Sequence, residues 1–98
     1  MKGKVISVTA LYLKPGIEEV LLPELAPIID ATRQLSGCLS FDLYRLCEDR
    51  HTLVLHETWE THEAEHGYAL SPLKSELTRL LARVLVQPMR TWEVEEVC

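Results

Sequence analysis

The stretch "HEAEH", residues 62–66, has the spacing of a zinc-binding helix. The pattern His-Glu-x-x-His places two imidazoles on one helix face, with the glutamate as general base for a zinc-bound water. Zinc-protease helices are buried, yet Glu65 places a charge between the glutamate and the second histidine, and residues 67–69 offer no third ligand. We therefore expect a solvated helix face here and no metal site.

A second set of residues surrounds Trp59. Alternation along a strand puts Leu55, Glu57 and Trp59 on one face, which we expect to be the face covered by helices. The indole can line an apolar pocket together with Leu55 and stack on a flat aromatic ligand, or it can simply be part of the core. Tyr44 can line the same pocket or a surface between two copies, and parity leaves both open.

Glu57 needs a partner if it is buried. Arg45 and Arg90 are the candidates for that partner. We expect a structural ion pair at Glu57 and not a catalytic carboxylate.

Composition limits the class of protein. The 98 residues suffice for one domain, residues 1–98, and 47% hydrophobic content is ample for a core. A net charge of −5 argues against nucleic acid or an anionic membrane as a partner. No apolar run approaches the roughly 20 residues of a membrane span, and a strand pattern starts so early that we expect no signal peptide.

The chain has three cysteines without CxxC spacing. An odd number of thiols fits a reducing compartment better than a disulfide framework, so we expect a cytoplasmic protein. We expect Cys38 and Cys47 to be small core residues and Cys98 to be a loose terminal thiol.

The chain divides into alternating strands and helices. Strand patterns cover residues 5–13, 38–46, 52–60 and 89–97, and the middle two form a hairpin. A helical stripe covers 17–36 and ends before Gly37; Pro23 and Pro27 predict that this helix is kinked or begins properly only near Pro23. Thr61 caps a short helix to about residue 70, and Ser71 caps another that starts with Pro72.

This order, β-α-β-β-α-β, predicts an α+β ferredoxin-like plait in which the helices cover one face of an antiparallel sheet. The first strand is apolar on both faces, so the other sheet face would expose apolar side chains to water. Burial of that face against a second copy would give a two-fold symmetric homodimer and would help to stabilise a small domain.

The sequence resembles the antibiotic-biosynthesis-monooxygenase-like family of dimeric α+β barrel proteins, which includes small quinol monooxygenases. The likeness runs from about residue 5 to 92, through "LKPG" (13–16), "ATRQLSGCLSFDLYR" (31–45) and "HETWETHEAEHGYALSP" (56–72). The resemblance implies a homodimer with a pocket between helices and sheet in each protomer. For some members it also implies oxygenation of a polycyclic phenol or quinol without metal, flavin or haem.

The sequence departs from this family at several positions. Members often carry a histidine where this chain has Tyr68. Polyketide-oxidising relatives use an asparagine at the position of Leu55 and a tyrosine at the position of Glu65. The haem-degrading branch places an iron-ligand histidine in the helix equivalent to residues 73–86, which contains none here.

Two functions remain open. The first is a cofactor-free monooxygenase acting on a small phenol or quinol or a polycyclic aromatic compound, with Trp59, Leu55 and Tyr44 binding the substrate. Because such chemistry needs a substrate anion, His66 or Tyr68 would handle the phenol proton as the catalytic residue; alternatively both are exposed helix residues. The second function is a non-oxygenase relative, either an isomerase of a small carbonyl compound or a dimeric ligand-binding or stress protein without turnover.

Overall fold

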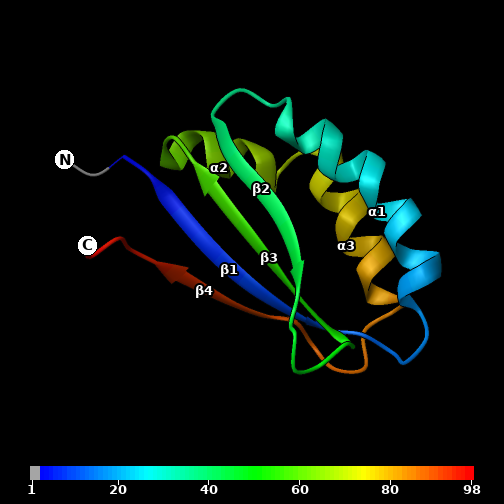
Figure 1. The fold of residues 1–98 in the computed structure, drawn as a ribbon. Coiled ribbons are helices and arrows are strands. Elements are labelled where there is room, and N and C mark those ends of the chain that lie inside the picture. The colour runs from blue at the N-terminus through cyan, green and yellow to red at the C-terminus, as the bar shows by residue number, and fades with distance from the viewer. Residues whose placement is uncertain (1–2) are drawn as a thin grey trace.

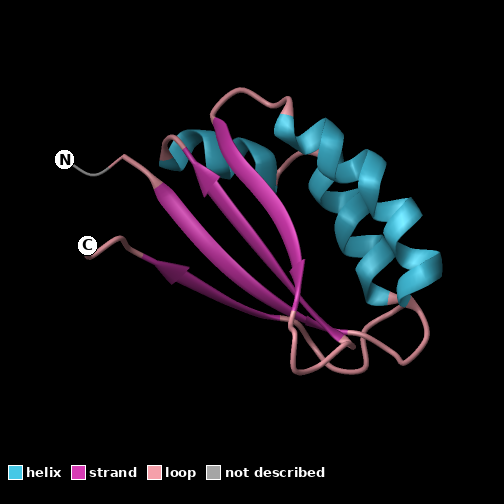
Figure 2. Ribbon diagram, in the orientation of Figure 1, coloured by secondary structure: helices cyan, strands magenta, loops and turns pink. Residues whose placement is uncertain are grey.

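The computed structural model describes residues 3–98 as a four-stranded antiparallel sheet with helices on one face (Figure 1, Figure 2). The elements are β1 Val5–Tyr12, α1 Glu18–Arg33, β2 Cys38–Arg45, β3 Thr52–Trp59, α2 His62–Ala69, α3 Pro72–Ala82 and β4 Arg90–Val94. The sheet order β2-β3-β1-β4 places the first and third strands in the centre, as in a ferredoxin-like plait. The predicted α+β fold is confirmed.

Helix α1 contains both prolines, Pro23 and Pro27, and begins at Glu18. The predicted later start near Pro23 is therefore wrong. Both rings are exposed, so the carbonyl groups that lose a helical partner lie on the solvent side, where water can satisfy them. The opposite face of α1 buries Leu21, Leu25, Ile28 and Ile29 against the core.

The caps of the other two helices form as predicted. The Thr61 hydroxyl accepts a hydrogen bond from the Ala64 amide at 3.1 Å and begins α2. The Ser71 hydroxyl accepts one from the Lys74 amide at 3.3 Å and begins α3, with Pro72 in its first turn. Of the cysteines, Cys38 is half-buried but Cys47 is exposed, so the expected core position of Cys47 is wrong.

Gly37 joins α1 to β2 in a backbone conformation that favours glycine, with φ at 86°. A Cβ at this position would also overlap the Cβ of Ala64 in α2. We therefore expect Gly37→Ala to lower the free energy of unfolding by about 2–4 kcal/mol, because a left-handed backbone and a steric clash add up. Gly16 is the matched control: its φ is 79° but nothing lies within 4 Å. Gly16→Ala should cost only about 1 kcal/mol, and equal losses in chemical denaturation would contradict the clash.

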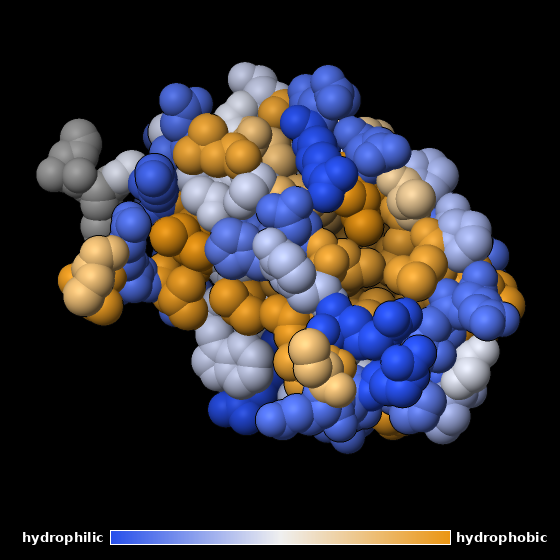
Figure 3. Space-filling view, viewed as in Figure 1, coloured by the Kyte–Doolittle hydropathy of each residue, from blue (hydrophilic) through white to orange (hydrophobic). Residues whose placement is uncertain are grey.

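The sheet face opposite the helices carries a band of apolar side chains. Strand register places on it Ile6, Val8, Ala10, Tyr12, Tyr44, Val54, Trp92 and Val94. Tyr44 and Trp92 are 56% and 39% exposed, and hydrophobic atoms gather over the strands in the space-filling view (Figure 3). None of the helices in residues 3–98 is both long and apolar enough to cross a membrane.

Candidate functional site

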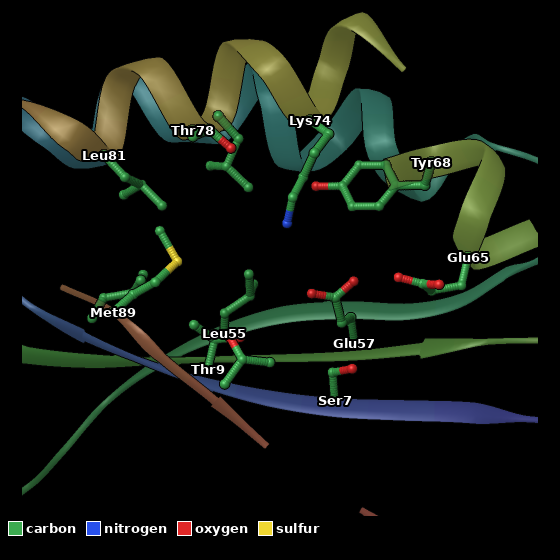
Figure 4. Close-up of a pocket in the computed structure, with 13 residues that line it drawn as sticks. Ser7, Thr9, Leu55, Glu57, Glu65, Tyr68, Lys74, Thr78, Leu81 and Met89 are labelled. Atoms are coloured by element: carbon green, nitrogen blue, oxygen red, sulfur yellow. Dashed lines mark hydrogen bonds between the residues drawn. The ribbon is translucent and has the colours of Figure 1, made fainter. Parts of the chain in front are cut away.

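A pocket lies between the helix layer and the sheet, with a volume of about 90 Å³ (Figure 4). Helices α2 and α3 supply one wall, and strands β1, β3 and β4 with the segment before β4 supply the other. Its lining includes Ser7, Thr9, Leu11, Leu55, Glu57, Glu65, Tyr68, Lys74, Leu77, Thr78, Leu81, Met89 and Thr91.

The lining has a polar end and an apolar end. The polar end lies near α2 and is formed by Glu57, Glu65, Tyr68 and Lys74. The apolar end lies farther along α3 and is formed by the leucines of that helix and by Met89, which faces them (Figure 4). Hydroxyl groups line the β1–β4 side, where the Thr9 and Thr91 side chains share a hydrogen bond of 3.0 Å. Such a pocket suits a ligand with one polar end and one apolar end.

The carboxylate of Glu57 is the buried charge of the site. The residue is 7% exposed, and its Oε1 accepts a hydrogen bond from the Trp59 indole N–H at 2.8 Å. Arg45 is exposed, Arg90 lies over the Trp92 ring at 4.8 Å, and none of the ion pairs in residues 3–98 includes Glu57. The expected structural ion pair is therefore wrong, and one carboxylate oxygen is free toward the pocket.

The phenol of Tyr68 is clamped between two aromatic rings. It stacks on Trp59 with centroids 4.9 Å apart and meets the edge of Phe41 at 5.8 Å. The residue is 3% exposed, and its hydroxyl has no hydrogen-bond partner, whereas the Thr32 hydroxyl donates to the Ile28 carbonyl. Burial, and next the Glu57 carboxylate, raise the pKa of the Tyr68 phenol, so it stays a neutral donor at neutral pH.

The ammonium of Lys74 reaches into the same space. Its Nζ lies 5.5 Å from the centroid of the Tyr68 ring, and the side chain descends from α3 toward the strands (Figure 4). Leu77, Thr78 and Leu81 follow Lys74 at spacings of three, four and seven, so one face of α3 lines the pocket. The pocket thus holds a proton acceptor, a fixed positive charge and a neutral hydroxyl donor.

The residues proposed from the sequence divide into two groups. The structure brings Tyr68 and Leu55 together in the pocket. Trp59 faces the helices as expected but is 0% exposed and lies behind Tyr68, which occupies the indole face where a ligand was expected to stack. His66 is exposed on α2 outside the lining, and Tyr44 lies on the opposite sheet face.

Three charged pocket residues were missed or misassigned: Glu57, Glu65 and Lys74. Two of them had a signal in the sequence. Glu57 interrupts an otherwise apolar strand face, and Lys74 lies on the apolar stripe of α3, where a solvated lysine would not be expected. Within residues 3–98, no three His, Cys, Asp or Glu side chains lie close enough together to hold a metal ion.

The unpartnered hydroxyl of Tyr68 predicts opposite effects on stability and binding. Tyr68→Phe removes a buried polar group without a partner, so the free energy of unfolding should rise by about 1 kcal/mol. Ligands that bond this hydroxyl should bind more weakly. Tyr44→Phe is the control for ligand binding, because its hydroxyl lies on the opposite sheet face and outside the pocket. A clear loss of stability in Tyr68→Phe during urea unfolding would show that the hydroxyl has a partner after all.

Comparisons with known proteins agree with this fold. The family model described as "Antibiotic biosynthesis monooxygenase" matches residues 4–72. A crystal structure of an antibiotic biosynthesis monooxygenase is similar with a TM-score of 0.87 and 21% identity, covering 96% of this chain and 99% of that one. No curated protein matches the sequence.

Two further solved structures show the same architecture. A protein from Mycobacterium tuberculosis has a TM-score of 0.86 at 23% identity, over 97% of this chain and 96% of that one. A conserved protein from Methanosarcina mazei Go1 has a TM-score of 0.90 at 18% identity, over 97% and 94%. These likenesses show the fold, and the family model covers most of the sequence. The chain therefore belongs to the antibiotic biosynthesis monooxygenase family.

Proposed function

We propose that this protein is a cofactor-independent monooxygenase that acts on a small phenol or quinol. Membership of the family supports the reaction class. The observation that carries the proposal is the buried, unpartnered hydroxyl of Tyr68 in a pocket that also holds Glu57 and Lys74. One substrate hydroxyl could form hydrogen bonds with all three side chains. It would donate to the Glu57 carboxylate and accept from Tyr68 and Lys74.

In this proposal Glu57 takes the hydroxyl proton, and Lys74 and Tyr68 stabilise the resulting oxyanion. The electron-rich anion then reduces oxygen directly. For a hydroquinone, one ring C–H bond, two O–H bonds and the O–O bond break, and one new C–O bond forms, so that the ring becomes a hydroxyquinone. The ring loses four electrons, one oxygen atom enters the product as the new hydroxyl group, and the other leaves as water. The substrate is the reductant, so the electron balance closes without a cofactor.

The size of the pocket favours a single-ring substrate over a polycyclic one. Its volume is about 90 Å³, whereas an engineered cavity of about 150 Å³ in another protein accommodates benzene. One ring requires movement of the flexible Met89 and Lys74 side chains, and several fused rings would require separation of α3 from the sheet.

The same small pocket favours one alternative, isomerisation of a small carbonyl compound. Glu57 would then remove a proton from the carbon next to the carbonyl, and Lys74 would stabilise the enolate. This reaction consumes no oxygen.

Oxygen uptake distinguishes the two functions. The wild-type protein is incubated with hydroquinones and with anthrone-type phenols, and an oxygen electrode follows consumption. We expect the rate of oxygen uptake to saturate as the concentration of a single-ring phenol is raised. If no phenol supports uptake but small ketones exchange their α-protons with deuterated water, the isomerase is correct and the monooxygenase is not.

We also propose that two copies join through their open sheet faces as a homodimer. The support is the apolar band over four strands, which a monomer would leave in water. A two-fold axis would bury the same residues on both copies.

A further inference from the structure

Trp59 contacts two groups of the pocket without lining it. Its indole N–H donates to Glu57 Oε1 at 2.8 Å, and its ring stacks on Tyr68 with an interplanar angle of 21°. The residue is 0% exposed, so a ligand in the pocket cannot touch it unless Tyr68 moves. Any effect of Trp59 on chemistry must therefore pass through these two neighbours.

The hydrogen bond matters because the Glu57 carboxylate has a competing partner. The Lys74 ammonium reaches into the same pocket, and an ion pair between the two would remove both the proton acceptor and the positive charge. Glu57 and Trp59 are two residues apart on one strand, so their side chains lie side by side on the helix-facing side. The indole N–H can therefore hold one carboxylate oxygen against the strand, while the other stays free for a substrate proton.

We propose that Trp59 is a positioning residue: its N–H fixes Glu57 as proton acceptor, and its ring holds the Tyr68 hydroxyl toward the substrate. The inference rests on the proposed function of Glu57. It goes beyond direct stacking of a ligand on the indole, and it assigns a separate role to each part of that side chain.

Several other groups face Glu57 and must stay unchanged in any test. They are Glu65 and Tyr68 from α2, Lys74 from α3 and Cys38 from β2. Burial, and next the Glu57 charge, raise the pKa of the Cys38 thiol, which stays neutral near pH 7. A substitution of Trp59 that keeps its shape therefore changes one interaction of the carboxylate and leaves the other charges in place.

The sharpest change replaces the indole N–H by sulfur. In a Trp92→Phe background, Trp59 is the one remaining tryptophan of the 98 residues. Growth with β-(3-benzothienyl)alanine then substitutes a ring of nearly the same shape that cannot donate. The matched reference is the same Trp92→Phe protein with ordinary tryptophan. Trp59→Phe, which also lacks the donor, serves as a second variant.

In the sulfur analogue, we expect kcat with a single-ring hydroquinone to fall by about 10- to 100-fold while KM changes less. A displaced base lowers the rate of proton transfer more than it weakens substrate binding. Leu25→Ala, a core change in α1 away from the pocket, should lower the melting temperature without lowering kcat. An unchanged kcat in the sulfur analogue would overturn the inference.

A second readout does not depend on turnover. In a ¹⁵N–¹H spectrum of the Trp92→Phe protein, the Trp59 indole proton should resonate at low field, because it is hydrogen-bonded to the Glu57 carboxylate. Glu57→Gln should move this resonance to higher field, and a resonance that Glu57→Gln does not move overturns the inference. If the resonance moves but Glu57→Gln keeps full oxygen uptake, the hydrogen bond is real and the proposed function of Glu57 is wrong. If Glu57→Gln loses uptake but the sulfur analogue does not, the function stands and the role of Trp59 fails.

Discussion

Replacement of Glu57 by glutamine is expected to lower the rate of phenol oxidation by about 100-fold or more. The amide has nearly the same shape, and its oxygen can still accept the Trp59 N–H bond seen at 2.8 Å. It cannot take the substrate proton, however, so the oxyanion forms only in the fraction of substrate that is already ionised in solution. Stopped-flow oxygen uptake at several pH values measures the effect, and the deficit should shrink as pH rises toward the pKa of the phenol.

Comparison with His66→Ala decides which residue handles the proton. The sequence suggested His66 for this role, but the side chain is exposed on α2 outside the pocket lining. We therefore expect His66→Ala to retain turnover close to wild type. If His66 handled the proton instead, this substitution would lower turnover by about 100-fold. A full rate in Glu57→Gln together with a large loss in His66→Ala would reject the carboxylate as base.

Replacement of Val8 by aspartate is expected to separate the proposed homodimer. Val8 lies in the central strand β1, between His56 of β3 and Trp92 of β4, at the middle of the open sheet face. A two-fold axis would bring the new carboxylate close to its copy in an apolar surface. Burial of unpaired charge and repulsion between like charges each cost several kcal/mol, so the dissociation constant should rise by about 1,000-fold or more.

Val20→Asp makes the same chemical change on the outer side of α1, where the side chain is 60% exposed. It should leave the assembly unchanged. Analytical ultracentrifugation at micromolar concentration should give about twice the 11.2 kDa chain mass for wild type and Val20→Asp. The Val8→Asp protein should sediment as a single chain. A wild-type protein of single-chain mass under these conditions would reject the dimer.

The sequence by itself determined the elements and their order. Strand alternation, the caps at Thr61 and Ser71 and the glycine after α1 act over a few residues, so their effects are visible locally. Parity also placed Trp59 on the helix-facing side of β3. Pro23 and Pro27 misled the prediction of the start of α1, because their cost depends on whether the freed carbonyl groups reach water, and that depends on which face of the helix is buried.

Only the tertiary structure decided which side chains meet in the pocket. His66 and Tyr68 differ by about 200° around a helix, so at most one of them can face the sheet, and packing of Tyr68 between Trp59 and Phe41 fixes the rotation of α2. The role of Glu57 likewise depends on a neighbour, because the indole N–H takes the place of the arginine that was expected as its partner. Lys74 enters the site only because α3 packs with that face toward the strands. Local pattern marks Glu57 and Lys74 as unusual in the sequence, but contacts between residues distant in the sequence decide that they meet in one pocket.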